Sequence, residues 1–275
     1  MKQSSNELQT EQITGGILDG VAVTIGYDSF LRRQSLQTAR GANTLSSQTY
    51  GYDPASRLQT VTSDSQTATF AYHPNSGLLN TTTFTGGTSF GRSYDSNGRL
   101  ETITITPAAD SARSYTYTYN NLNQRMRVTR EDGSYWSYIY NDRGELVSGK
   151  KYWSDNSVVW GAQTEYNFDN IGNRKYARNG GNQLGSLRES IYTANSLNQY
   201  TQRTVPGAID VTGTANTGAT VTVNDGATIR KGEYFYKELA IDNSTGPVYS
   251  QINVVGARNN FGPRICPGND FYTQV

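Results

Sequence analysis

One serine, Ser89, sits in a segment that has the pattern of a hydrolase nucleophile site: GTSFG, residues 87–91. The G-x-S-x-G pattern holds a serine on a sharp turn between a strand and a helix. A histidine and a carboxylate must then activate its hydroxyl. His73 is the only histidine of the chain, and residues 74–88 contain no carboxylate, so the acid would have to precede the histidine. The candidate acids are Asp28, Asp53 and Asp64.

The context of Ser89 favours a structural role over a catalytic one. The residues that follow it, FGRSYDSNGRLETITIT, indicate another strand and turn instead of the helix that the motif requires. His73 occupies a position that is filled by Asp28, Asp53 and Asp95 in similar segments, which indicates a turn residue. We interpret Ser89 as a residue at the edge of a loop, and a nucleophile as the alternative.

Carboxylate pairs offer a second kind of chemistry. Glycoside hydrolysis needs two carboxylates about 5 to 9 Å apart, one of them with a raised pKa. Glu165 and Asp169, beside Tyr166 and Phe168, are one candidate pair. Glu233 and Glu238 are another, although an odd separation of five places them on opposite faces of a regular strand. The sequence singles out no catalytic residue among these.

Cofactor and metal sites are not indicated. The segment G144ELVSGKK approaches a phosphate-binding loop but has Lys151 where a serine or threonine must hold magnesium. The turns D95SNG and N141DRG lack the distant glutamate of a calcium loop. A thiolate pair of Cys266 with His73 is a further option, but the cysteine lies in an irregular terminal segment. We predict no cofactor and no metal.

The composition predicts an all-β protein. The chain has 275 residues with 20 Tyr, 28 Gly and 17% charged residues, and its threonines, tyrosines and valines recur in alternating stretches. A net charge of +1 gives no field that would attract nucleic acid or an anionic membrane. No apolar run is long enough to span a bilayer, so we expect neither nucleic acid nor membrane as a partner.

A short motif repeats along the chain: an aromatic residue, an acid or amide, and then a cluster of Gly, Arg and Leu. The copies begin 20 to 28 residues apart and are Y27DSFLRR, Y52DPASRL, Y72HPNSGL, Y94DSNGRL, Y119NNLNQR, Y140NDRGEL, F168DNIGNR and Y192TANSLNQY. The repeat positions that we expect to be structural are Tyr27, Asp28, Tyr52, Asp53, Tyr72, Tyr94, Asp95, Gly98, Arg99, Tyr119, Tyr140, Gly144, Phe168, Asp169, Gly172 and Tyr192.

Each copy predicts a β-hairpin. Aromatic residues alternate before the turn, as at Tyr115, Tyr117 and Tyr119, and so lie on one face of a strand. Asp or Asn then supplies turn chemistry, and Gly tolerates positive φ. A single hairpin cannot bury its aromatic face, so stability has to come from neighbouring repeats.

These copies resemble the YD repeats of RHS proteins over about residues 20–205. The resemblance implies a long β-sheet that spirals into a hollow shell. Bacterial toxins of this kind enclose a toxic domain in such a shell, and teneurin-like proteins use it as an extracellular scaffold. It also implies a bacterial parent protein that is secreted or on the cell surface.

The ends of the chain differ from the repeats. Residues 1–19 form a polar N-terminal segment, and residues 206–262 have short alternating strands between N-T-G, N-D-G and S-T-G-P turns, which predicts a small β-sandwich. The latter stretch is similar to Ig-like modules of bacterial surface proteins. Residues 263–275 continue neither pattern and read as an irregular tail, so we interpret the chain as a fragment of a larger protein.

Two functions follow from these observations. The first is a structural or interaction role in a toxin-enclosing shell or a surface scaffold that contacts carbohydrate. Its partners would be other repeats of the parent chain, or further copies bound through open sheet edges. The second is a hydrolase, with a glycosidase preferred to a serine esterase.

Overall fold

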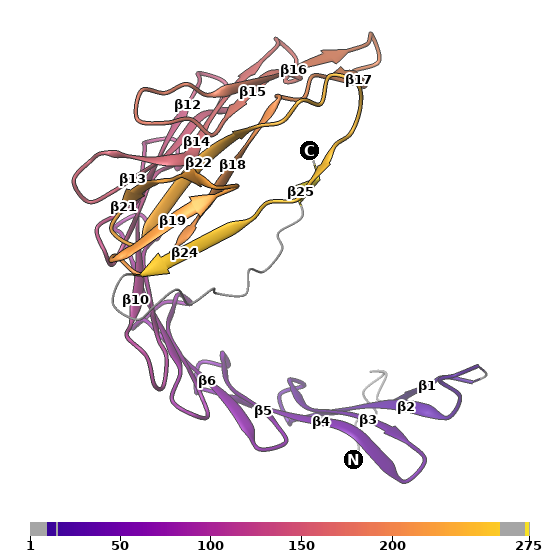
Figure 1. Ribbon diagram of the computed structural model, residues 1–275. Coiled ribbons are helices and arrows are strands. Elements are labelled where there is room, and N and C mark those ends of the chain that lie inside the picture. Colours follow the sequence, from indigo (N-terminus) through magenta and orange to yellow (C-terminus); the bar gives the residue numbers. More distant parts are fainter. Residues whose placement is uncertain (1–9, 15, 259–272, 275) are drawn as a thin grey trace. The chain divides into compact units, whose positions relative to one another are not determined.

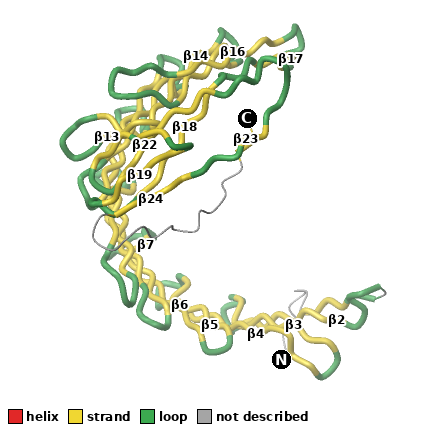
Figure 2. The backbone as a smooth tube through the Cα atoms, viewed as in Figure 1, coloured by secondary structure: helices red, strands yellow, loops and turns green. Residues whose placement is uncertain are grey.

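The computed structural model describes residues 10–14, 16–258 and 273–274. The chain divides into two compact units, Met1–Tyr117 and Thr118–Val275. Strands and loops alternate throughout the described residues (Figure 2). None of these residues lies in a helix of the length and apolarity needed to cross a membrane.

The first unit is an antiparallel meander in which each strand pairs with the next one along the chain (Figure 1). Its strands are β1 (Thr10–Gln12), β2 (Val21–Tyr27), β3 (Arg33–Arg40), β4 (Asn43–Tyr52), β5 (Leu58–Ser63), β6 (Gln66–Tyr72), β7 (Leu79–Phe84), β8 (Ser89–Tyr94), β9 (Leu100–Thr106) and β10 (Arg113–Tyr119). Strand β1 lies within the predicted polar N-terminal segment, where Thr10 pairs with Thr24.

The second unit begins with another antiparallel meander of the same kind. Its strands are β11 (Arg125–Arg130), β12 (Tyr135–Tyr140), β13 (Leu146–Tyr152), β14 (Val158–Phe168), β15 (Arg174–Asn179), β16 (Arg188–Ala194) and β17 (Tyr200–Arg203). The prediction of an all-β array of hairpins is therefore confirmed. The predicted boundary at residue 206 lies between this meander and the strands that follow it.

A β-bulge marks the aromatic residue of most repeats. In the first hairpin Gly26 pairs with Ser35 whereas Tyr27 pairs with Arg33, so one residue of β3 is left over. Such a bulge increases the local twist and redirects the side chain beside it. The same shift occurs at Tyr52, Tyr72, Tyr94, Tyr140 and Phe168.

The rest of the second unit is a small two-layered β structure. One layer has the order β18 (Ala208–Thr214), β22 (Tyr234–Ala240), β21 (Ile229–Lys231), and the other β20 (Gly226–Ala227), β19 (Ala219–Val223), β24 (Val254–Arg258). A further pair joins β23 (Tyr249–Ser250) to β25 (Thr273–Gln274). The core between the layers contains Val221, Val223, Phe235 and Ile252. We call residues 208–258 the sandwich.

The sandwich packs against the meander of its own unit. The Tyr234 hydroxyl donates to the main-chain oxygen of Trp160 at 2.6 Å. A Cβ on Gly161 would lie 3.1 Å from Thr212 and 3.2 Å from the Tyr236 ring, so glycine allows this close approach.

Burial in the two meanders differs accordingly. In the second, Val159, Gln163, Ala177 and Ser190 are almost completely buried on β14, β15 and β16. In the first unit, the described residues include only two that are buried, Val21 and Thr82. The first meander thus has little core of its own, and its stability depends on contacts along the sheet.

Candidate functional site

The turns of the repeats share one hydrogen-bonded arrangement, which begins with an acid or amide. In the first turn, Asp28 Oδ1 accepts the main-chain N–H groups of Phe30 at 2.8 Å and Arg32 at 3.0 Å. Its other oxygen accepts from Arg32 Nε at 2.7 Å. The hydrogen bond from the Arg32 side chain is the main cause that holds the pKa of Asp28 below its usual value.

The same carboxylate–guanidinium pair recurs in two further turns. Arg57 Nε donates to Asp53 Oδ2 at 2.7 Å, and Arg99 Nε donates to Asp95 Oδ2 at 2.7 Å. Burial acts to raise the pKa of each aspartate, but hydrogen bonds from the arginine outweigh it, so both pKa values are lowered. These aspartates are therefore ionised turn residues at neutral pH.

Other copies change both partners together. Where the first position of the turn is Asn120, the fifth is Gln124, and Asn120 Nδ2 donates to Gln124 Oε1 at 2.7 Å. Asn141 likewise donates to Glu145 at 2.6 Å. In the turn of Asp169, the direction reverses. Here the fifth residue, Asn173, donates to the carboxylate at 3.0 Å. In these turns the first and fifth positions thus hold a donor and an acceptor that match.

The turn of the last copy starts two residues later than its aromatic residue indicates. Its turn begins at Asn195, which donates to Gln199 at 3.1 Å. Ala194 therefore stands where other copies have the aromatic residue, and Tyr192 lies two residues earlier on β16. The copy at His73 is also different, because the main-chain N–H of His73 bonds to the oxygen of Leu78, one residue further than in the other turns.

The aromatic residue connects each turn to the repeat before it. The Tyr52 hydroxyl donates to the main-chain oxygen of Arg33 at 2.8 Å, and the Tyr72 hydroxyl donates to that of Leu58 at 2.7 Å. Tyr94 and Tyr140 make the same bond, at 3.0 and 2.9 Å. These bonds satisfy each hydroxyl and fix the ring against the preceding hairpin.

The fifth residue of a turn also reaches the next repeat. The Arg32 guanidinium lies 4.5 Å from the centre of the Tyr52 ring, and its Nη1 donates to Ser56 at 2.9 Å. In the second unit Gln124 donates to the main-chain oxygen of Gly144 at 3.2 Å. We call this set of contacts the turn ladder. Its pairs are Asp28/Arg32, Asp53/Arg57, Asp95/Arg99, Asn120/Gln124, Asn141/Glu145, Asp169/Asn173 and Asn195/Gln199.

A comparison with known protein families identifies one that matches the first repeats. Residues 3–111 match the family described as Teneurin YD-shell. This part of the chain is similar to YD-shell proteins. A search of curated proteins gives no match.

Three solved structures contain chains that are similar to this one. They are the crystal structures of TcdB2-TccC3-Cdc42, of TcdB2-TccC3-TEV and of TcdB2-TccC3 without its hypervariable C-terminal region. Each aligns with a TM-score of 0.41, at 15 or 16% identity, over 86 or 87% of this chain. This chain spans 15% of the length of those chains.

Ser89 and His73 are not brought together. Ser89 is the first residue of β8, after the turn that contains Gly86 and Gly87. The His73 ring lies 3.2 Å from the main-chain oxygen of Arg92, three residues further along β8. Three residues of a strand extend about 10 Å, beyond the reach of a hydrogen bond from His73 to the serine hydroxyl. Ring contact with Tyr94 completes a structural environment for His73.

The carboxylate candidates are each engaged in local contacts. Glu165 lies 2.8 Å from Lys150 on the neighbouring strand, while Asp169 caps its own turn. The pKa of Asp169 is lowered, since its hydrogen bonds outweigh the effect of burial, whereas a general acid needs a raised pKa. Glu238 contacts Arg188, and Glu233 lies in the turn before β22.

The structure does not support the other candidate binding motifs of the sequence. The segment at Gly144 that approaches a phosphate-binding loop continues into strand β13, not into a helix. The described residues contain no cluster of ligands that could hold a metal ion. Cys266 lies outside the described residues.

A charged cluster that the sequence did not reveal joins the sandwich to the sheet. Arg188 on β16 bonds to Asp210 on β18 and to Glu238 on β22, and its side chain is only 17% exposed. Burial, with the nearby Asp210 carboxylate, raises the pKa of Tyr236. Nearby, Lys231 forms an ion pair with Asp155 at 2.5 Å, and its hydrogen bond lowers the pKa of that carboxylate. Arg188 is separated from its partners by 22 and 50 residues, so no local pattern could identify them.

Proposed function

We propose that this chain is a structural segment of an RHS/YD-repeat shell, a stretch of wall formed by hairpins that continue into further repeats of a larger protein. The turn ladder supports this role, because its residues connect one repeat to the next along the sheet. In the proposed shell, these contacts hold the curved wall together where an ordinary domain would use a core.

The same proposal includes the partners of the wall segment, the module attached to it and the location of the parent protein. Its partners are other repeats of the parent chain, and the wall encloses a toxic domain or carries a surface scaffold that contacts carbohydrate. The sandwich is an Ig-like module fixed to the wall. The parent is a bacterial protein that is secreted or displayed on the cell surface.

The exposed strand β17 allows a test of whether this chain binds further strands. The four residues of β17 are all exposed, and this strand pairs with β16. A wall segment should associate with further strands through such an edge. We expect concentration-dependent self-association in sedimentation experiments, reduced by Arg203→Pro, which removes a main-chain donor that faces away from β16, and retained in Arg203→Val.

The experiment that separates wall from enzyme is turnover on chromogenic glycosides and short-chain esters. A wall segment gives rates equal to the buffer control. Ester hydrolysis that is lost in both Ser89→Ala and His73→Ala would overturn the proposal in favour of a serine hydrolase. Glycoside turnover insensitive to both substitutions would overturn it in favour of a carboxylate pair.

A further inference from the structure

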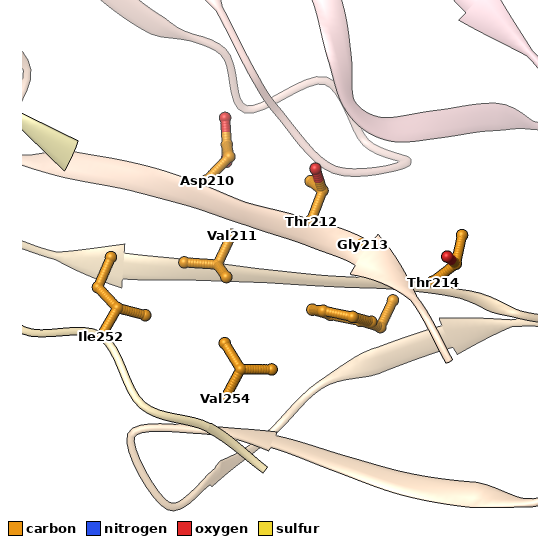
Figure 3. A pocket seen from close by; sticks show the side chains of 8 residues that line it. Asp210, Val211, Thr212, Gly213, Thr214, Ile252 and Val254 are labelled. Atoms are coloured by element: carbon orange, nitrogen blue, oxygen red, sulfur yellow. The ribbon is translucent and has the colours of Figure 1, made fainter. Parts of the chain in front are cut away.

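A groove of about 430 Å³ opens in the sandwich, between strands β18 and β24 (Figure 3). Five consecutive residues of β18, 210–214, line it together with Phe235, Ile252 and Val254. Side chains of a strand alternate between its two faces. Five consecutive residues can line one groove only if the groove follows the edge of the strand, where the main chain of each residue is accessible.

The hydrogen-bond pattern shows which main-chain groups face this edge. Gly207 accepts from Ile241, and Ala215 donates to Glu233, so the odd-numbered residues of β18 bond to the β22 side. In an antiparallel pair, the intervening residues direct their N–H and C=O groups the other way. Residues 208, 210, 212 and 214 therefore face the groove with these groups. Strand β18 ends its layer, and within the described part of the chain no strand pairs with this edge.

The floor of the groove is apolar, and the one charged side chain of its lining is paired with an arginine. Phe235 and Ile252 are 6 and 4% exposed, and form the floor with the half-buried Val211 and Val254. Asp210 is the one charged residue of the lining, but its side chain points to the opposite side of β18 from Val211 (Figure 3). There it bonds to Arg188.

We propose that this groove binds an extended polypeptide segment of another chain, which adds a strand to β18 and inserts apolar side chains over the floor. The unpaired main-chain groups require a backbone that offers donors and acceptors at the spacing of a strand. The apolar floor favours a segment with apolar residues at alternate positions. Because Asp210 is already paired with Arg188, the groove offers no free charge to a charged residue of that segment. Five lining residues of β18 fit a segment of about five residues.

A labelled peptide with the sequence TGATVTVN, which copies residues 217–224, is a suitable probe because it alternates valine and threonine and carries no charged side chain. Fluorescence anisotropy with the full chain measures its binding. Two N-methylated versions, one methylated at the threonines and one at the valines of the TVTV core, block alternate main-chain donors. We expect the parent peptide to bind and one methylated version to lose binding.

A substitution in β18 tests the same contact from the protein side. Thr214 is exposed, and its main-chain N–H faces the groove. Thr214→Pro removes this donor without removing a bond to β22. We expect it to weaken peptide binding about fivefold to tenfold, whereas Thr214→Val keeps the donor and the affinity. Equal melting temperatures for the two variants show that both are folded.

Three results would overturn the proposal. The first is no change in anisotropy with the parent peptide, and the second is binding that is insensitive both to N-methylation and to Thr214→Pro. The third is self-association of the chain that the peptide displaces, which would identify a second copy as the occupant in place of another protein.

Discussion

The Arg57 guanidinium lies 4.4 Å from the centre of the Tyr72 ring, one repeat further along the chain. The same side chain donates to Asp53 at 2.7 Å within its own turn and to the main chain of Ser76 in the next turn. One arginine therefore closes a turn, holds the aromatic residue of the next hairpin and bonds to the turn that follows. The motif that repeats in the sequence is a device for attaching repeats to one another.

Exchange of one matched pair for another should preserve the turn ladder. Asp53→Asn leaves Arg57 without a carboxylate, and Arg57→Gln leaves Asp53 without a guanidinium. We expect each single substitution to lower the free energy of unfolding, because each leaves a half-buried hydrogen-bonding group without its partner. The double variant Asp53→Asn/Arg57→Gln creates the pair seen at Asn120 and Gln124, and should recover part of this loss.

Urea unfolding of the two single variants and the double variant measures the coupling. Arg113→Ala is the control, since the Arg113 side chain is 58% exposed and lies outside the turn ladder. Losses that simply add in the double variant would show that the two positions do not act as a pair.

The fourth position of the turn should prefer glycine even where the sequence has another residue. Leu31 has a φ of +61° and a largely exposed side chain, while the equivalent Gly98 has a φ of +73°. A left-handed conformation costs about 1–2 kcal/mol for a residue with a Cβ. Leu31→Gly should therefore raise the free energy of unfolding by about 1 kcal/mol, after the entropy cost of glycine in the unfolded chain.

Thermal unfolding of Leu31→Gly and Gly98→Leu tests this directly, with opposite shifts expected. The matched control is Leu122→Gly, an exposed leucine that is not among the residues with positive φ. A stabilisation of equal size in the control would attribute the effect to loss of an exposed apolar side chain instead of backbone conformation.

The turns and the alternating aromatic residues could be predicted because both depend on neighbours in sequence. Asp28 and Gly98 show turn chemistry, and Tyr115 and Tyr117 show the alternation of a strand. The pairing of first and fifth positions was missed because the fifth residue varies among Arg, Gln, Glu and Asn. The fifth residue pairs with the first in each of these turns, but this is visible only when both residues are compared together.

Other features depend on three-dimensional contacts that no local pattern encodes. Arg188 and Asp210 belong to different layers, and Gly161 is required because Tyr236 approaches it. In the last repeat, Ala194 and not Tyr192 occupies the position of the aromatic residue, because the register shift that marks this position lies at Ala194.

Acid should weaken the turn ladder. The pKa values of Asp28, Asp53, Asp95 and Asp169 are lowered in the folded chain from a usual value of 3.8. When the pKa of a carboxyl group is lower in the folded state than in the unfolded state, the group stabilises the fold at pH values above its unfolded pKa. This stabilisation is lost as the pH falls through the folded pKa. Stability should therefore be constant near neutral pH and decrease below about pH 4.

Unfolding by urea between pH 7 and pH 2.5 measures this dependence. In the Asp53→Asn/Arg57→Gln variant, one carboxylate no longer titrates, so the decrease should be smaller than in the unchanged chain. An equal decrease in both proteins would assign the acid sensitivity to carboxylates outside the turn ladder.

Release of the sandwich from the sheet should follow the loss of Arg188. Its side chain and that of Asp210 are 17 and 15% exposed, so Arg188→Ala leaves a largely buried carboxylate without its partner. Removal of one member of a buried ion pair costs about 3–5 kcal/mol. Hydrogen exchange should then increase at Ser190 and Ala177, and proteolysis should cut more readily between Arg203 and Ala208. Lys175→Ala, an exposed residue on β15, should change neither. Unchanged exchange in Arg188→Ala would show that Tyr234, Gly161 and Lys231 hold the sandwich in place without the charged cluster.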